Sequence, residues 1–326
     1  MKKALILFIG IGLVLSCSKD TVVDDEPTTP TEYMVSLGFS GEITEISESP
    51  LRSTESNDLY GIQVYAVPNN GSSDYKPYAY GLFDDKSLMT IKLLEGYKYK
   101  FVSSMVVDGK NRLLFSRDGY LSPFVTTHVT SLNNTFNFSS SKEMEILSYG
   151  QTNLKSFSLE FQRPNIDRYY GQVEGYIPSD NSSVSINMKR VVFGVKVEVE
   201  GVSEGQVKIS LSEAPDLHIE YPETEIQDIF TFQNNYSYPL SWTKDDYSET
   251  ITLSFTWLKV DGAEVPVATQ DVVFKRNMLT TIRVKVNDAL VDKSLTITTE
   301  STEMGDGGTF DVEGDGGTDT PIDPNP

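Results

Sequence analysis

The sequence predicts an all-β protein with two tandem β-sandwich domains of transthyretin-like or immunoglobulin-like topology. Short stretches of alternating apolar and polar residues recur along most of the chain, separated by turn-forming sequences. Helical periodicity is almost absent. The chain has 326 residues, which corresponds to two domains at roughly 150 residues each. We therefore expect one sandwich over residues 33–180 and a second over 181–303, between non-globular ends.

Residues 1–16 are predicted to be a signal peptide, because a basic start is followed by an apolar run from Ala4 to Leu15. The run is too short to span a bilayer. It ends in Val14-Leu15-Ser16-Cys17, which resembles a bacterial lipobox. Cys17 would then be the first residue of the mature protein and carry acyl chains such as palmitate, which hold the protein on the membrane. An ordinary secretory signal with an incidental cysteine is the alternative.

Cys17 is the only cysteine, so neither an intrachain disulfide nor a thiolate metal cluster is expected. The net charge of −20 excludes a general role in nucleic-acid binding, because phosphate contacts need many Lys and Arg side chains.

Both ends of the chain are acidic and of low hydrophobicity. Eight acidic residues and no Lys or Arg lie between Asp20 and Leu51, and the same holds between Glu300 and Pro326. We expect residues 17–32 to be a flexible tether and residues 304–326 a disordered tail. The tail repeats GDGGTFDVE as GDGGTDTPI, so a calcium-binding β-roll is the alternative there.

The first alternating segment after the tether covers Tyr33 to Ser40. It places Tyr33, Val35, Leu37 and Phe39 on one face, which is typical of a half-buried strand. Similar segments continue the first domain at 59–67, 90–94, 97–107, 134–139 and 154–161. The polar stretch IPSDNSS then marks the boundary, and further strands of the second domain are expected at 184–201, 206–214, 228–233, 237–243, 249–262, 270–275, 279–288 and 294–301.

The inventory of reactive side chains argues against an enzyme. His128 and His218 are the only histidines and lie in different predicted domains, which disfavours a Ser-His-Asp triad or a two-histidine metal site. The sequence has no glycine-rich phosphate loop. We expect no enzymatic activity, no cofactor and no metal. A surface glycosidase needs only two carboxylates, and the chain has 47 acidic residues, so this class stays a lesser alternative.

Aromatic residues raise a second functional possibility. Exposed tyrosines stack on sugar rings, and the candidates for such a surface are Tyr97, Tyr99, Tyr169, Tyr170, Tyr236 and Tyr238. The competing interpretation is that aromatic residues alternating in strands line the core. A glycan-binding surface lipoprotein of a carbohydrate-uptake system is therefore kept as the alternative function.

Several segments together resemble the fimbrillins, or type V pilins, of anaerobic outer-membrane bacteria. The order of lipobox, acidic tether, alternating strand, arginine-bearing polar segment and NDLYGIQVY is similar to the start of these proteins. Further along, LLEGYKYKFVSSM, MKRVVFGVKVEV and FKRNMLTTIRVKV are similar to later fimbrillin strands.

The resemblance implies a surface or fimbrial location and a specific route of assembly. In such pilins a trypsin-like protease cuts the lipidated precursor after an arginine, the first strand is lost, and a strand of the next subunit replaces it. In this chain Arg52 would be the cut residue and Ser53 the new first residue. The displaced strand would be the one that carries Tyr33, Val35, Leu37 and Phe39.

The partners implied are other pilin subunits, with a host or bacterial surface protein or glycan as a target of adhesion. The last 22 residues are rich in Gly, Asp and Pro and depart from the apolar alternation of a donor strand. An accessory tip or anchor adhesin is therefore considered beside a shaft subunit.

Overall fold

The computed structural model describes residues 30–43, 57–71, 74–116, 119–125, 132–146, 150–151, 160–232, 239–286 and 297–304. These residues form twenty β-strands and three short 3₁₀ helices, so the predicted all-β class is confirmed. The predicted signal peptide, most of the tether, the Arg52 segment and the tail beyond Met304 lie outside the described residues.

The first half of the molecule is built on one eight-stranded sheet with the order β4-β1-β12-β11-β5-β2-β3-β8. Its strands are β1 (Glu32–Gly41), β2 (Leu59–Pro68), β3 (Lys76–Phe83), β4 (Thr90–Leu94), β5 (Tyr97–Val106), β8 (Phe136–Phe138), β11 (Arg168–Tyr176) and β12 (Ser183–Arg190). Two small ribbons, β6 (Leu114–Ser116) with β7 (Gly119–Ser122) and β9 (Gly150–Gln151) with β10 (Glu160–Phe161), and the helices η1 (Lys86–Leu88) and η2 (Gly109–Arg112) accompany it.

This sheet folds over on itself at the β11–β12 pair. The two strands are paired only at Tyr169↔Arg190 and Tyr170↔Lys189, near one end of each. Beyond that point β4, β1 and β12 form one layer and the other five strands form the second. Apolar side chains from both layers meet in a single cluster, so the first half is a sandwich joined along one edge.

The second half is a sandwich of two four-stranded sheets, β16-β13-β19-β20 and β15-β14-β17-β18. Its strands are β13 (Val192–Glu200), β14 (Gln206–Leu211), β15 (Leu217–Glu220), β16 (Glu225–Thr231), β17 (Ser248–Leu258), β18 (Glu264–Lys275), β19 (Met278–Lys285) and β20 (Ile297–Glu303), with η3 at Pro239–Thr243. Met304, the first residue of the predicted tail, is buried against Val192 and Leu279.

The change from one half to the other falls at Val191, between β12 and β13. The polar stretch IPSDNSS predicts a boundary between residues 180 and 181, whereas β12 pairs with β1 and β11 in the sheet of the first half. The core is continuous across this point. Val191 belongs to a buried cluster with Leu59 and Tyr170 of the first half and Phe193 of the second.

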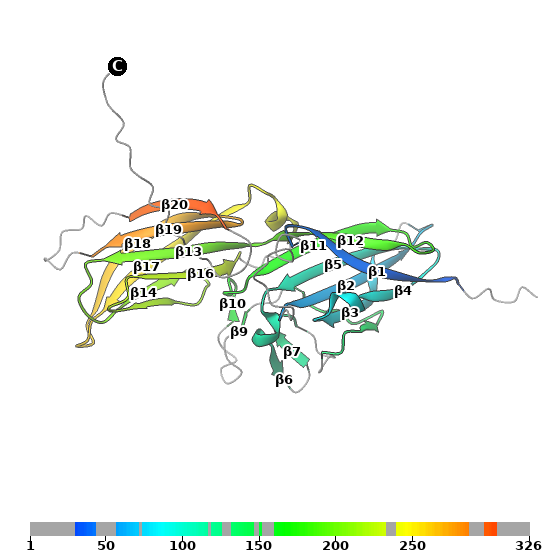
Figure 1. Cartoon of the computed structure of the whole chain (residues 1–326), viewed down its shortest axis with the longest axis horizontal. Coiled ribbons are helices and arrows are strands. Elements are labelled where there is room, and N and C mark those ends of the chain that lie inside the picture. The colour runs from blue at the N-terminus through cyan, green and yellow to red at the C-terminus, as the bar shows by residue number, and fades with distance from the viewer. Residues whose placement is uncertain are drawn as a thin grey trace, which may run out of the picture.

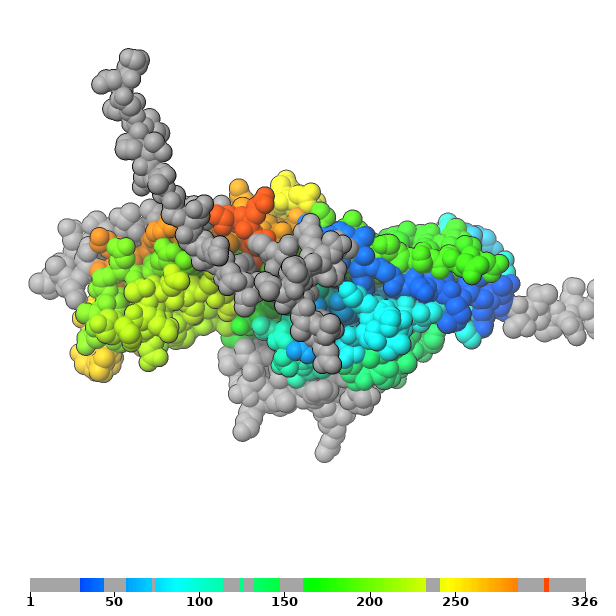
Figure 2. All heavy atoms as spheres, in the orientation of Figure 1, coloured from blue at the N-terminus to red at the C-terminus, as the bar shows by residue number. Residues whose placement is uncertain are grey.

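Strand β1 runs along the first half toward the second. Figure 1 shows its dark blue ribbon reaching from the outer end of the first half to the junction of the two halves. In the space-filling view of Figure 2 the same residues form a dark blue band on the surface, between green and cyan residues. One face of β1 is thus open to solvent while the other covers the core.

Candidate functional site

The backbone of β1 is held by two different neighbours. Its first half pairs antiparallel with β4, from Glu32↔Leu94 to Ser36↔Thr90. Its second half pairs parallel with β12, from Ser36↔Ser183 to Gly41↔Met188. The next strand in the sequence, β2, lies in the opposite layer. No turn therefore joins β1 to either of the strands that hold it.

The inward face of β1 completes the core of the first half. Val35 is 0% exposed and Leu37 is 6% exposed, while Tyr33 and Phe39 are half-buried against the same cluster. The ring of Phe39 stacks on Tyr60 of β2 with centroids 5.4 Å apart. Burial stabilises the strand by about 1.5 to 3 kcal/mol for each fully buried apolar side chain.

The place that β1 occupies is called the β1 slot below. It consists of the edges of β4 and β12 that pair with β1 and of the core side chains beneath the strand. The side chains that β4 and β12 contribute to this floor are Ile91, Leu93, Val184, Ile186 and Met188.

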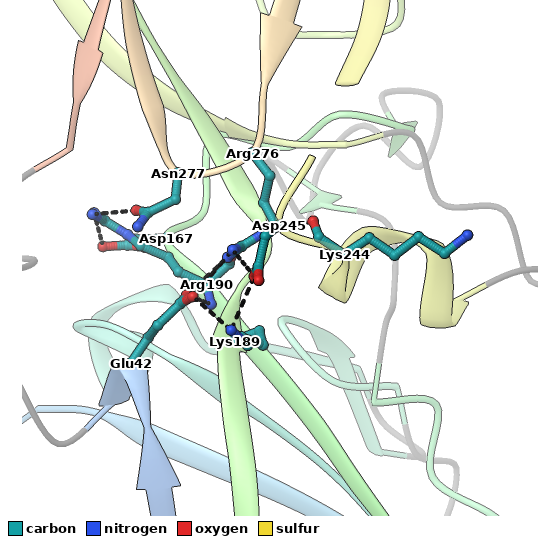
Figure 3. Close-up of polar contacts among 8 residues, drawn as sticks. All are labelled: Glu42, Asp167, Lys189, Arg190, Lys244, Asp245, Arg276 and Asn277. Carbon is teal, nitrogen blue, oxygen red and sulfur yellow. Dashed lines mark hydrogen bonds and ion pairs between the residues drawn. The ribbon is translucent and has the colours of Figure 1, made fainter. Parts of the chain in front are cut away.

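A cluster of charged side chains closes the slot at the junction of the two halves (Figure 3). Glu42, directly after β1, accepts hydrogen bonds from Arg276, with Nη1 2.8 Å from Oε2 and Nη2 3.1 Å from Oε1. The backbone N–H of Arg190 also donates to Oε2, at 2.7 Å, and Lys189 Nζ lies 3.3 Å from Oε1. We call Glu42, Lys189, Arg190, Asp245 and Arg276 the junction cluster.

Arg276 comes from the turn between β18 and β19 and is only 5% exposed. Its Nε donates to the carbonyl of Lys244 at 3.0 Å, and its Nη1 donates to the carbonyl of Arg190 at 2.9 Å. Asp245, 80% exposed, accepts from both Arg276 and Lys189 at 3.0 Å. The guanidinium is thus fixed by main-chain oxygens and directed at the end of β1.

Arg190 is the most deeply buried residue of the junction cluster. Its Nε and Nη2 donate to the two carboxylate oxygens of Asp167 at 2.9 and 2.8 Å, a bidentate pair. Its Nη1 lies 3.4 Å from the side-chain oxygen of Asn277. Because Asp167 already balances Arg190, the charge that faces Glu42 comes from Arg276 and Lys189.

The surroundings shift the pKa of two groups in opposite directions. Burial opposes ionisation of Glu42, but the hydrogen bonds from Arg276 and Arg190 and the charges of Arg276 and Lys189 outweigh it and lower its pKa. The hydrogen bond to Asp245 and the charges of Glu42 and Asp245 raise the pKa of Lys189 against the effect of burial. Both shifts favour the charged forms of Glu42 and Lys189.

The structure describes only some of the site residues that the sequence predicts. Tyr33, Val35, Leu37 and Phe39 lie together in β1, facing the core. Cys17, Arg52, Ser53, His128, Tyr236 and Tyr238 lie outside the described residues.

The buried positions of Tyr99, Tyr169 and Tyr170 confirm the core interpretation for these three candidates. Tyr97 is half-exposed.

The junction cluster was not predicted. The acidic composition of residues 20–51 predicts a solvated side chain for Glu42, but only 20% of it is exposed. The sequence held one signal, an acid directly after a glycine at the end of an alternating strand. Its partners are 147 or more positions away in the chain and carry no local pattern.

Within the described ranges, no three or more His, Cys, Asp or Glu side chains are grouped so that they could hold a metal ion. The same residues include no helix with the length and hydrophobicity needed to cross a membrane.

No protein-family model and no curated protein sequence matches this chain. Among solved structures it is similar to the fimbrial anchor protein Mfa2 from Porphyromonas gingivalis, at 11% identity and a TM-score of 0.38 over 84% of this chain and 98% of that one. It is also similar to the tip fimbrial protein Mfa3 from the same organism, with a C-terminal truncation, at 11% identity and a TM-score of 0.34 over 84% and 100% of the two chains.

A candidate adhesin from Bacteroides thetaiotaomicron matches at 12% identity and a TM-score of 0.38 over 86% of this chain and all of that one. The structural neighbours of this all-β chain are thus fimbrial and candidate adhesion proteins of Porphyromonas and Bacteroides.

Proposed function

We propose that this chain is a cell-surface fimbrial subunit or fimbria-associated adhesin, anchored through an acylated Cys17 and assembled by exchange of β1 for a strand of another subunit. The observation that carries the proposal is the position of β1. The strand completes both a sheet and a core, yet no turn connects it to β4 or β12.

The contacts of the slot support the proposed exchange. Loss of β1 alone would expose the polar edges of two strands and the apolar floor between them, which is strongly unfavourable in water. An incoming extended strand would restore the backbone hydrogen bonds and refill the side-chain positions at alternate residues. The slot therefore favours replacement of β1 over its simple release.

Cleavage at Arg52 would free β1 from the rest of the chain. The segment SESPLRSTESND around it is polar and contains Pro50, which disfavours a continuous strand ladder. With the bond after Arg52 cut, β1 would be held by noncovalent contacts alone and open to a competitor.

The test is limited proteolysis of the signal-free protein with dilute trypsin, followed by sequencing of the new N-terminus. We expect Ser53 to appear first and the product to form dimers or ladders that resist mild detergent. Arg52→Ala is the matched control and should remain intact and monomeric under the same conditions. First cuts within the two sandwiches, with Arg52 intact, would remove the cleavage step.

Acylation is tested separately. Fatty-acid labelling and retention in the membrane fraction should both be lost on Cys17→Ala. An unchanged distribution would show that Cys17 is not the anchor.

A row of aromatic rings in the first half favours glycan binding as the second candidate function. Phe138 is 55% exposed, and its ring meets Tyr78 edge-on with centroids 5.4 Å apart. Tyr78 in turn contacts Tyr99, which contacts the half-exposed Tyr97. Retention on immobilised polysaccharides that is lost in the Tyr97→Ala and Phe138→Ala variants would support this function, and no retention would remove it.

A further inference from the structure

We propose that the β1 slot selects its occupant through a glycine–acid pair at the junction end. The accepted strand runs parallel to β12 and carries three apolar residues at alternate positions, then one further residue, a glycine and an acid. In this chain Val35, Leu37, Phe39, Gly41 and Glu42 show that order. The inference rests on the strand exchange proposed above and defines the chemistry of the partner strand.

The acid is required because the slot ends in a preformed carboxylate site. Arg276 donates to the carbonyls of Lys244 and Arg190, contacts that do not involve Glu42, and its side chain is 5% exposed with Glu42 in place. Without Glu42, the exposed Asp245 would be the remaining carboxylate facing both Arg276 and Lys189. The N–H of Arg190 would also lose its acceptor in Glu42. A strand without a carboxylate would therefore leave two cations, Arg276 and Lys189, with one exposed carboxylate between them.

The glycine is required by two independent features of the same place. Gly41 has φ of +81°, a conformation that L side chains rarely adopt. A Cβ at this residue would lie 2.8 Å from the backbone oxygen of Met188 and 2.6 Å from the side-chain oxygen of Asn187. Gly38 differs on both counts, since the nearest atom to its Cβ would be 3.9 Å away. Only the glycine next to the acid is therefore selected.

The carboxylate site also fixes direction and register. At the other end of β1, Glu32 pairs with Lys92 at 2.8 Å, but both side chains are about half exposed, so that pair contributes little. A strand in the opposite direction would bring its acid to this weak end. A slip by one residue would turn its apolar side chains to solvent.

The experiment uses the signal-free full chain in which residues 50–55 are replaced by the recognition site of a specific protease, so that opening does not depend on Arg52. After cleavage, a labelled peptide with the sequence of residues 32–43 is added at pH 7 and its binding is followed by fluorescence anisotropy. The peptides Glu42→Gln and Gly41→Ala are expected to bind about tenfold more weakly, or worse. The matched control peptides Glu32→Gln and Gly38→Ala should stay within about twofold.

Reciprocal variants assign the effect to the site. In Lys189→Gln and Arg276→Gln chains, the preference for the native peptide over its Glu42→Gln form should shrink. Lys189, with a side chain 31% exposed, is the safer change if Arg276→Gln does not fold. Equal binding of native and Glu42→Gln peptides to the unchanged chain would overturn the inference and leave strand exchange standing. If none of the peptides binds, both the inference and the proposed strand exchange are overturned.

Discussion

Glu42 joins the two halves of the molecule through one side chain. Its carboxylate lies at the end of β1, and its main partner, Arg276, belongs to the second sandwich. Both side chains are largely removed from water, so water cannot easily replace either partner when it is lost. A substitution at this position should therefore lower the stability of both halves, not of β1 alone.

In the intact chain, Glu42→Gln should lower the free energy of unfolding by about 1 to 3 kcal/mol, because it leaves the buried guanidinium of Arg276 with the exposed Asp245 as its one remaining charged acceptor among the described residues. Urea unfolding followed by circular dichroism measures this. Glu32→Gln, which removes an exposed carboxylate at the other end of β1, should change stability by less than about 0.5 kcal/mol. Equal effects of the two changes would contradict the role given to the junction cluster.

The same residue predicts a pH dependence. The pKa of Glu42 is lowered in the folded state from its ordinary value of 4.5, so the unfolded state binds this proton first as the pH falls. Its contribution is present in full above about pH 4.5 and is lost progressively below it. The stability difference between the native protein and Glu42→Gln should therefore narrow between pH 5 and pH 3. A constant difference across that range would show that the charge of Glu42 contributes nothing.

At the scale of single elements, β1 shows what the alternation of residues along the chain can and cannot predict. Alternation predicts a strand at residues 33–40, and β1 spans Glu32–Gly41. It also predicts which residues face inward, since burial follows the period of two. What it cannot supply is the partner, because pairing with β12 joins positions 147 apart in the chain.

The run MKRVVFGVKVEV shows the limit of the same pattern. The sequence predicts it as part of one strand, but the structure divides it at Val191, whose N–H donates to the carbonyl of Arg168 at 2.8 Å. Arg168 is the first residue of β11, so no pattern within the run itself could predict this bond. The junction cluster was missed for the same reason, since its charged groups come from β12, the turn after β18 and the segment after η3.

The core face of β1 gives a prediction for the whole strand. Leu37→Ala should destabilise the protein by about 2 to 5 kcal/mol, because it removes a buried side chain between the two layers. Ser36→Ala, one position away on the exposed face, should lie within about 0.5 kcal/mol of the native protein. Thermal and urea unfolding of the two variants give the comparison, and similar values for both would argue that β1 does not complete the core.

At the scale of the whole molecule, the last described residue, Met304, still belongs to the fold. Met304 is buried against Val192 and Leu279, and β20 pairs with β19 from Val284↔Ile297 to Met278↔Glu303. The sequence after Met304 is rich in Gly, Asp and Pro, which predicts no further packing.

Removal of residues 305–326 should therefore leave the melting temperature unchanged within a few degrees, whereas removal of 297–326 should lower it clearly, because β19 would lose β20, one of its two partner strands. Differential scanning calorimetry distinguishes the two truncations. A gain in stability of the full chain on addition of calcium, absent from the shorter form, would instead support the β-roll alternative for the tail.

The pairing of β1 also determines the direction of force that the strand resists best. Because β1 lies along the long axis of the first half (Figure 1) and is bonded at its flanks to β4 and β12, a pull along its axis loads those backbone bonds together, in shear. Peeling would break them one at a time and needs a force across the strand. A strand seated in this slot is therefore best held against tension applied along its own length, which is the load that a filament carries when flow drags on the cell at its end.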